Sequence, residues 1–182
     1  MGQIEDSTGR ISHLVAAAKQ YSQMDRAAHQ EIDVRDGLKS TLVMLSHKIN
    51  ERGINVVKDF DHSLPTIPAH PAELNQVWTN LIDNAVYAMA EGGTLTVRTV
   101  REDGWVLVEI CDTGAGIPVE MQQKIFEPFF TTKPVGEGTG LGLDISYRVI
   151  TQRHGGDLRV VSHPGDTRFQ VRLPLTEPPS FG

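Results

Sequence analysis

The sequence is short of several features that mark particular classes of protein. Its single cysteine, Cys111, excludes an intrachain disulfide and favours a reducing compartment. No apolar run approaches the length of a membrane span, and the N-terminal residues lack the apolar core of a signal peptide. The net charge of −6 argues against nucleic acid as the main partner. We therefore expect no membrane span and no nucleic-acid site within residues 1–182.

The length and composition describe an ordinary globular protein. A chain of 182 residues, 39% hydrophobic and 22% charged, is long enough for one domain with its own core plus an appendage. Because the chain is acidic overall, an anionic ligand would need local binding devices, such as backbone amides, a metal ion or a few placed cations.

An amphipathic helix is expected near the N-terminus, at residues 8–24. Its apolar side chains form a narrow stripe close to a heptad seam: Ile11, Leu14, Val15, Ala18 and Tyr21. Such a seam suits packing against a partner helix, so we interpret this segment as one helix of a longer helical hairpin. The chain then divides into residues 1–30, the hairpin helix and linker, and residues 31–182, a separate domain.

The rest of the chain alternates between strand and helix periodicities. Strands are expected at 31–35 and 54–61, as a pair within 93–114, and as a last pair at 157–162 and 167–175. Helices are expected at 36–53, 72–90 and 140–156, with a proline-broken loop at 64–71 and one short helix within 118–138. Helices grouped between antiparallel strand pairs indicate an α+β fold, in which one sheet layer is covered by one helix layer.

A run of glycines stands directly before the last expected helix, in GEGTGLGL at residues 136–143. It does not match the GxGxxG pattern, because Leu141 or Leu143 stands where the third glycine would be, and it is not a P-loop, because no Lys-Ser or Lys-Thr follows it. Glycines nevertheless let backbone N–H groups approach phosphate oxygens, and the helix start adds its positive dipole end. The run alone leaves two interpretations open, a phosphate-binding loop and a flexible hinge before a helix.

The helix expected at 72–90 carries two asparagines beside its apolar arc. Asn80 and Asn84 are four residues apart and share a face. Glu73 and Tyr87 lie along the same edge. Asparagine is a poor helix former, so the pair needs an explanation. One is that the amide oxygens face a metal–phosphate group, because Mg²⁺ takes oxygen ligands and is shared with substrate phosphates. The other is a pair of solvated or capping amides.

The segment CDTGAGI ends an apolar strand with an acidic residue. Asp112 closes the strand, and Gly114 and Gly116 open the chain directly after it. A carboxylate at a strand end can accept a hydrogen bond from an exocyclic amine such as that of adenine. Alternatively, Asp112 is simply the aspartate of an Asp-x-Gly turn.

Four segments in a fixed order give the chain a resemblance to a known family. NQVWTNLIDNA, DTGAGIP, FEPFFTTK and GEGTGLGL resemble the N, G1, F and G2 boxes of the histidine kinase ATP-binding domain, within the GHKL superfamily that includes gyrase, Hsp90 and MutL ATPases. The resemblance covers roughly residues 31–175 and is similar to the short-lid, nitrogen-regulator type of sensor kinase. It implies a Bergerat-type fold, a two-layer α/β sandwich whose mixed, mainly antiparallel sheet is covered by helices.

The resemblance also implies roles for individual residues. Asn84 would coordinate Mg²⁺, and Asp112 would bind the adenine amino group. Asn80 and Lys133 would assist catalysis at the phosphates. The ends of a mobile lid over the ATP would be anchored by three phenylalanines: Phe126, Phe129 and Phe130. The full set of expected nucleotide-binding residues is Asn80, Asn84, Asp112, Gly114, Gly116, Ile117, Phe129, Thr132, Lys133, Gly138, Thr139, Gly140, Leu141, Gly142 and Thr167.

The implied function is that of the ATP-binding catalytic core of a two-component sensor histidine kinase. Such a core transfers the γ-phosphoryl group of ATP to a histidine and thence to the receiver domain of a response regulator. We expect a bacterial, cytoplasmic location, ATP and Mg²⁺ as cofactors, and a homodimer formed through the N-terminal helix of the full-length protein.

Two features depart from the family pattern. The phosphoacceptor box is not present, because His13 and His29 stand in unsuitable contexts, so we expect the acceptor histidine outside these residues. Asn80 stands where gyrase-type relatives carry a glutamate base, which favours transfer to a protein nucleophile over hydrolysis. Two alternatives remain: a nucleotide-gated interaction module without kinase activity, and a serine-phosphorylating relative such as an anti-sigma factor. The hairpin-like helix disfavours the second.

Overall fold

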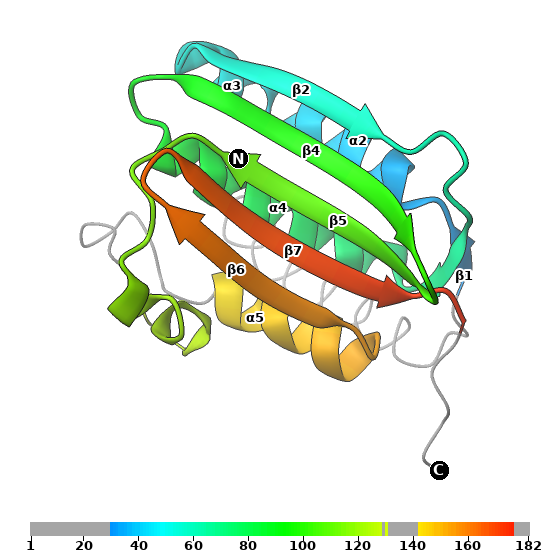
Figure 1. Ribbon diagram of the computed structural model, residues 1–182. Helices are drawn as coiled ribbons and strands as arrows, with labels where there is room; N and C mark the ends of the chain where they lie inside the picture. Colours follow the sequence, from blue (N-terminus) through cyan, green and yellow to red (C-terminus); the bar gives the residue numbers. More distant parts are fainter. Residues whose placement is uncertain (1–29, 129, 131–141, 177–182) are drawn as a thin grey trace, which may run out of the picture.

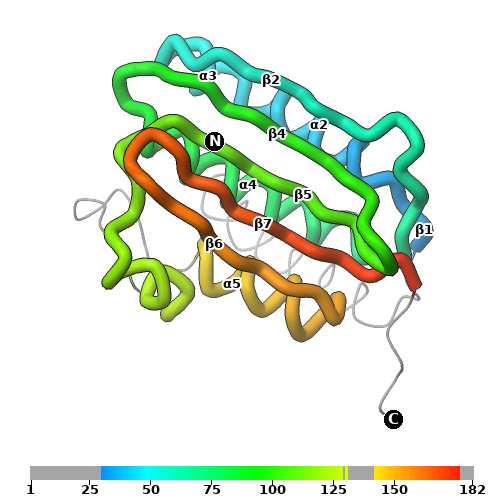
Figure 2. Tube along the Cα trace, viewed as in Figure 1, coloured from blue at the N-terminus to red at the C-terminus, as the bar shows by residue number. Residues whose placement is uncertain are grey.

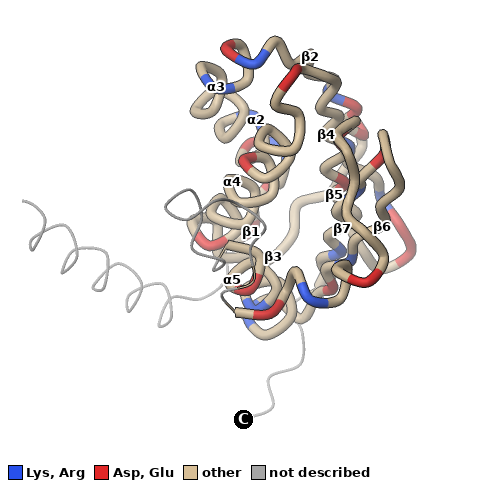
Figure 3. The backbone as a smooth tube through the Cα atoms, turned by 90° about the vertical axis from the view of Figure 1, so that its left-hand side faces the viewer, with Lys and Arg blue, Asp and Glu red and all other residues tan. Residues whose placement is uncertain are grey.

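The structure consists of a sheet layer and a helix layer. The computed structural model describes residues 30–128, 130 and 142–176, and the helix expected at 8–24 lies outside them. Seen face-on, the main sheet lies in front of the helices (Figure 1). Turned by 90°, the helices form one column and the strands of this sheet a second column beside it (Figure 3). The expected two-layer α+β architecture is confirmed.

The main sheet is mixed and mainly antiparallel, as expected. Its strands are β2 (Ile54–Phe60), β4 (Gly93–Glu102), β5 (Trp105–Asp112), β6 (Asp157–His163) and β7 (Asp166–Pro174). They lie in the order β2-β4-β5-β7-β6, with β2 and β4 parallel and the other neighbouring pairs antiparallel. Gly104 and Gly165, both with positive φ, form the tight turns of the β4–β5 and β6–β7 hairpins.

The described helices cover one face of this sheet (Figure 1). They are α2 (Val34–Met44), α3 (Ser46–Glu51), α4 (Pro71–Ala88), α5 (Gly142–Arg148) and the π-helical turn η3 (Val149–Arg153). Pro71 starts α4, as expected, because the first helical position needs no N–H. None of these described helices combines the length and apolar character required to cross a bilayer.

The core lies between the two layers. The apolar arc predicted for this helix is buried and consists of Leu74, Val77, Trp78, Leu81, Ile82, Ala85 and, at the C-cap of α4, Met89. It packs against the inward-facing residues of the sheet, which include Leu95, Val97, Val106, Val108, Ile110, Phe169 and Val171. Gly37 lets α2 approach α4 closely, because a Cβ there would overlap the side chain of Asn75. The sheet and α4 are therefore closely packed together and support the residues at the end of β5 and at the start of β7.

The proline-broken loop expected at 64–71 contains a short strand, so this expectation was wrong in part. β3 (Ile67–Ala69) pairs antiparallel with β1 (Gln30–Ile32) in a separate two-stranded sheet. Pro68 is tolerated there because a two-stranded sheet consists of edge strands, which need no hydrogen bond on one side.

Two other elements differ in detail. The helix expected at 36–53 breaks at Leu45 into α2 and α3. The segment after β5 contains two 3-10 turns, η1 (Val119–Met121) and η2 (Lys124–Phe126), where one short helix was expected. The last helix is closed at Gly155, which has a φ of +66°.

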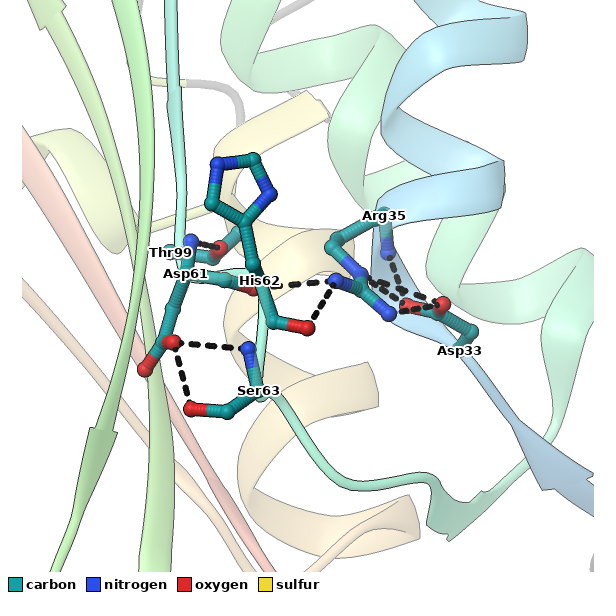
Figure 4. Close-up of polar contacts among 6 residues, drawn as sticks. All are labelled: Asp33, Arg35, Asp61, His62, Ser63 and Thr99. Atoms are coloured by element: carbon teal, nitrogen blue, oxygen red, sulfur yellow. Dashed lines mark hydrogen bonds and ion pairs between the residues drawn. The ribbon is translucent and has the colours of Figure 1, made fainter.

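A charged cluster fixes the start of α2 to the loop after β2 (Figure 4). Asp33 caps α2 by accepting the N–H of Arg35 at 3.0 Å, and the Arg35 guanidinium contacts both oxygens of the same carboxylate. The guanidinium also donates to the carbonyl oxygens of Asp61 and His62, at 2.9 and 3.2 Å. The hydrogen bonds from Arg35 lower the pKa of Asp33. This cluster therefore anchors the point where the chain enters the domain.

Candidate nucleotide-binding site

The described residues of the expected site gather where β5 ends. Asp112 is the last residue of β5 and pairs with Thr167 near the start of β7. Behind these strands lies α4, which carries Asn80 and Asn84 (Figure 1). The start of α5, at Gly142, is hydrogen-bonded to α4. The fold thus brings together expected site residues from four separate elements.

Asp112 is a buried carboxylate held by the loop that follows it. It is 3% exposed, and its Oδ1 accepts the N–H of Gly114 at 2.9 Å. Burial raises the pKa of Asp112, and the hydrogen bond from Gly114 opposes part of that rise. Within the described ranges it forms no ion pair with a basic side chain. A buried acceptor of this kind suits an N–H donor of a ligand, such as an exocyclic amine.

Two glycines let the loop after β5 pass close to other backbone segments. A Cβ at Gly114 would lie 2.6 Å from the carbonyl oxygen of Ala88, at the end of α4. A Cβ at Gly116 would lie 2.9 Å from the carbonyl oxygen of His163, and Gly116 has a φ of +89°. The N–H of Gly165 donates to the Gly114 carbonyl at 2.8 Å. The loop is therefore held between α4 and the β6–β7 hairpin, beside which it runs in the chain trace (Figure 2).

Side chains add a second set of bonds between this loop and the hairpin. The hydroxyl of Ser162 accepts the N–H of Ile117 at 2.8 Å and shares a hydrogen bond of 2.6 Å with the hydroxyl of Thr167. The amide nitrogen of Gln122 donates to the carbonyl oxygens of Ile117 and Ser162, at 2.9 and 3.2 Å. Ser162 and Gln122 could not be predicted as part of this site, because a single serine in a strand and a glutamine in a loop carry no distinctive pattern.

Asn80 joins α4 to the start of α5. Its Nδ2 donates to the Gly142 carbonyl at 3.1 Å and lies 3.2 Å from the Ser146 hydroxyl. Ser146 is fully buried and donates to the same carbonyl at 2.8 Å. The alternative of a purely solvated amide therefore does not describe Asn80. Asn84 lies one turn further along α4 and is half-buried.

Glu73 is placed by the sequence on the same edge of α4 as the asparagines, but in the structure it is buried in an ion pair. Arg153 of η3 donates to both of its carboxylate oxygens, at 2.8 and 3.2 Å. Nearby, Nε2 of His154 accepts the N–H of His70 at 3.1 Å, so Nδ1 carries the hydrogen and donates to the Val149 carbonyl at 2.9 Å. These contacts tie the start of α4 to η3, the continuation of α5.

The other expected site residues lie outside the described part of the chain: Phe129, Thr132, Lys133, Gly138, Thr139, Gly140 and Leu141. His13 and His29 lie outside it as well. Of the expected lid anchors, Phe126 packs against Tyr147 of α5 and Phe169 of β7, with ring centroids 5.4 and 6.5 Å apart. Phe130 also packs against the core.

The one expected metal ligand, Asn84, lies among the described residues. Among the described residues, no group of three or more His, Cys, Asp or Glu side chains is placed to hold a metal ion. Asn84 offers an amide oxygen, and Mg²⁺ takes oxygen ligands while keeping several waters and substrate phosphates. An ion at Asn84 would therefore complete its coordination with a triphosphate and water.

Two curated relatives are similar to most of this chain. The sensor kinase CckA of Brucella abortus (strain 2308) is 35% identical over 187 residues, which cover 94% of this chain and 20% of that protein. The sensory histidine kinase/phosphatase NtrB of Klebsiella oxytoca is 35% identical over 151 residues, which cover 71% of this chain and 42% of that protein. The chain thus spans less than half the length of either relative.

Solved structures agree with the sequence relatives. The catalytic domain of histidine kinase ThkA superposes with a TM-score of 0.75 at 30% identity, covering 81% of this chain and 96% of that one. Full-length ShkA, solved in complex with AMPPNP, has a TM-score of 0.74 at 27% identity and covers 97% of this chain and 38% of that one.

The family described as "Histidine kinase-, DNA gyrase B-, and HSP90-like ATPase" matches residues 69–177. This range runs from the end of β3 past β7 and includes Asn80, Asp112 and Thr167. The chain therefore belongs to the histidine kinase-, DNA gyrase B- and HSP90-like ATPases, as a catalytic domain of the sensor histidine kinase type.

Proposed function

We propose that this domain binds Mg²⁺-ATP at the end of β5 and transfers the γ-phosphoryl group to a histidine outside residues 1–182. The observation that carries the proposal is the buried carboxylate of Asp112, which stands beside Thr167 above a loop of closely packed glycines. The nucleotide analogue bound by the full-length ShkA structure supports an ATP site on this fold.

Each described residue has a proposed task in binding. Asp112 accepts a hydrogen bond from the adenine amino group, and the loop at Gly114 and Gly116 lets the base lie against backbone. Asn84 supplies an oxygen ligand to Mg²⁺, which when bound neutralises phosphate charge. Asn80 holds the start of α5, so that the N–H groups at this helix start face the phosphates.

The reaction requires little covalent chemistry from the domain. The bond between the γ-phosphorus and its bridging oxygen breaks, ADP leaves, and a histidine ring nitrogen forms the new bond to phosphorus. Positioning and charge neutralisation suffice for this transfer. Asn80 is not a carboxylate base, so activation of water for hydrolysis is not favoured. The lid residues, with Lys133 at the γ-phosphate, belong to this proposal through the family resemblance.

The partners follow from the same family. We propose that residues 1–30 form part of a dimerisation hairpin and that the full-length protein is a homodimer in the bacterial cytoplasm. Its phosphohistidine would pass the phosphoryl group to the receiver domain of a response regulator. ThkA, which shares this fold, has been solved in complex with the response regulator protein TrrA.

The test combines binding and transfer. ATP titration in the presence and absence of Mg²⁺ should give measurable affinity that depends on the ion, and Asn84→Ala should remove this dependence. Incubation with γ-labelled ATP should leave residues 1–182 unlabelled, and should label a histidine on an added polypeptide that carries the acceptor helix. Label on His13 or His29 would contradict the assignment of the acceptor to another segment. Tight ATP binding with no transfer to any acceptor helix would favour the nucleotide-gated module instead.

A further inference from the structure

A row of three polar side chains crosses the sheet beside the expected adenine position. Strand register places Ser162 of β6 opposite Thr167 of β7, and Thr167 opposite Asp112 of β5. Residues paired in register on neighbouring strands share a face, so the three side chains lie side by side on the helix-covered face. All three are at most 5% exposed. Asp112 and Thr167 are among the expected nucleotide-binding residues, whereas Ser162 is not.

The direction of the hydrogen bond between the two hydroxyls follows from their partners. A hydroxyl has one hydrogen to donate and two lone pairs. Ser162 Oγ already accepts the N–H of Ile117, and within residues 30–128, 130 and 142–176 its other partner is Thr167 Oγ1. If Thr167 donated, Ser162 would accept twice and its own buried hydrogen would have no acceptor at the edge strand.

The opposite direction avoids this cost. If Ser162 donates to Thr167, the remaining hydrogen belongs to Thr167, which lies between Ser162 and the Asp112 carboxylate. A hydrogen on that side is attracted by the anion, whereas a leftover hydrogen on Ser162 is not. The hydrogen bonds then run in one direction, from Ile117 N–H to Ser162, to Thr167, and towards the ligand.

We propose that Ser162 is a positioning residue that makes Thr167 a hydrogen-bond donor and thereby sets the selectivity of the site for adenine. This inference rests on the proposed ATP site. The edge of adenine presents an amino donor next to a ring-nitrogen acceptor, and Asp112 with an outward-donating Thr167 is the complementary acceptor–donor pair. Guanine presents a carbonyl oxygen next to an N–H, which is the reverse pattern. Ser162 touches no ligand and acts through Thr167, either directly on the base or through a bridging water.

The test measures a preference rather than an affinity. ATP is compared with 1-deaza-ATP, in which the ring nitrogen beside the amino group is replaced by C–H. The wild-type chain should bind ATP about 5- to 10-fold more tightly than 1-deaza-ATP, the size of one neutral hydrogen bond. Ser162→Ala should reduce this preference to less than about twofold, because Thr167 then loses its fixed direction. Thr167→Val should do the same, and Thr167→Ser should keep the wild-type preference.

Gln122→Ala is the matched control. It removes the hydrogen bonds from Gln122 to the carbonyl oxygens of Ile117 and Ser162, but leaves the hydroxyls of Ser162 and Thr167 in place. It should weaken ATP and 1-deaza-ATP equally, so that the preference stays at the wild-type value. A general loosening of the loop therefore gives a different result from a lost hydroxyl direction.

The outcomes separate this inference from the function on which it rests. A wild-type chain that binds neither nucleotide contradicts the proposed ATP site itself. Wild-type binding of ATP with no preference over 1-deaza-ATP overturns the donor role of Thr167. A full preference in Ser162→Ala, with ATP binding intact, overturns the role of Ser162 alone.

Discussion

The two faces of β5 carry two buried carboxylates in opposite electrostatic surroundings. Asp112 faces the helix layer and is 3% exposed, whereas Glu109 faces the open side of the sheet and is 2% exposed. Arg98 and Gln170, on the neighbouring strands, bind the two oxygens of Glu109. Burial alone would raise the pKa of Glu109, but the hydrogen bonds from Gln170 and Arg98 lower it. The pKa of Asp112 is instead raised by burial.

The comparison shows that burial of a carboxylate does not by itself identify a site. Glu109 is the centre of a cross-strand row that continues through Arg98 to Asp59, with an Arg98–Asp59 separation of 3.6 Å. Its charge is already compensated by protein groups, so it stabilises the sheet and offers nothing to a ligand. Asp112 has one backbone donor and no cation among the described residues. A carboxylate left in this state is available for a ligand.

The largest predicted effect on ligand binding is a difference in ATP affinity between variants of the two carboxylates. Asp112→Asn should weaken ATP binding by about 10-fold or more, because the site loses a charged acceptor for the adenine amine. Glu109→Gln should change ATP affinity by less than about twofold. Isothermal titration of both variants measures this difference, and equal losses in the two would break the distinction between a ligand-binding and a structural carboxylate.

The next effect compares the two ends of β5. Gly104 and Gly116 both have positive φ, at +78° and +89°, but a Cβ at Gly104 has no atom within 4 Å, whereas one at Gly116 meets the His163 backbone. Gly104→Ala should cost about 1 kcal/mol of unfolding free energy from backbone strain alone. Gly116→Ala should cost about 2–3 kcal/mol, because backbone must also move. Chemical denaturation gives both values, and a Gly116 variant no less stable than the Gly104 variant contradicts the tight packing of the loop.

A smaller effect is the pH-dependent contribution of Glu109 to the free energy of unfolding. Its folded pKa lies below the ordinary 4.5, so the carboxylate adds stability above that pH and loses this contribution as the pH falls through the folded pKa. Glu109→Gln should therefore lower the free energy of unfolding by about 1–2 kcal/mol at pH 7, and the difference from wild type should close in acid. Denaturant titrations from pH 7 down to the acid limit of folding measure it.

Neutralising Asp112 should change the free energy of unfolding in the opposite direction to neutralising Glu109. Its folded pKa lies above the ordinary 3.8, so the ionised form is penalised in the native state at neutral pH, and the penalty disappears below 3.8. Asp112→Asn should raise the unfolding free energy at pH 7 by less than about 1 kcal/mol, and this gain should vanish as the pH falls. Destabilisation by Asp112→Asn at pH 7 would show that the carboxylate has a structural partner besides the N–H of Gly114.

An effect on chemical reactivity, and not on binding or stability, is expected at Cys111, which lies between the two carboxylates on β5 and faces the open side. Burial, together with the charge of Glu109, raises the pKa of its thiol to about 11. Alkylation by iodoacetamide at pH 8 should be about 10-fold slower than that of a free cysteine, and should accelerate as the pH approaches the thiol pKa. Alkylation as fast as that of free cysteine would show that the open face is less well covered than the buried Glu109 indicates.

Much of the fold and part of the site could be predicted from local pattern. The apolar arc of α4, its start at Pro71 and the strand pairs follow from periodicity and turn residues, because each depends on neighbours within a few positions. The glycines of the loop after β5 could also be predicted, since close backbone approach leaves few other residue types. The expectations failed at the strand β3, at the start of α2 at Val34, at the break at Leu45 and at the two 3-10 turns after β5, because the local signals there are short or contradicted by proline.

The roles of the charged and hydroxyl side chains depended on contacts between distant segments. Periodicity placed Glu73 beside Asn80, but Arg153, which comes 80 residues later, binds it as an internal ion pair. In the same way, no pattern around Ser162 predicted that its hydroxyl oxygen accepts a hydrogen bond of 2.8 Å from the N–H of Ile117, which lies 45 residues earlier in the chain.

Local sequence was enough to single out the glycines and the strand-ending aspartate at the end of β5, because these are chemically unusual choices at such positions. What each carboxylate on β5 does depends on the assembled sheet. Strand order and register place Arg98 next to Glu109 and Thr167 next to Asp112, and the pKa of each carboxyl depends on these neighbours as well as on its own type.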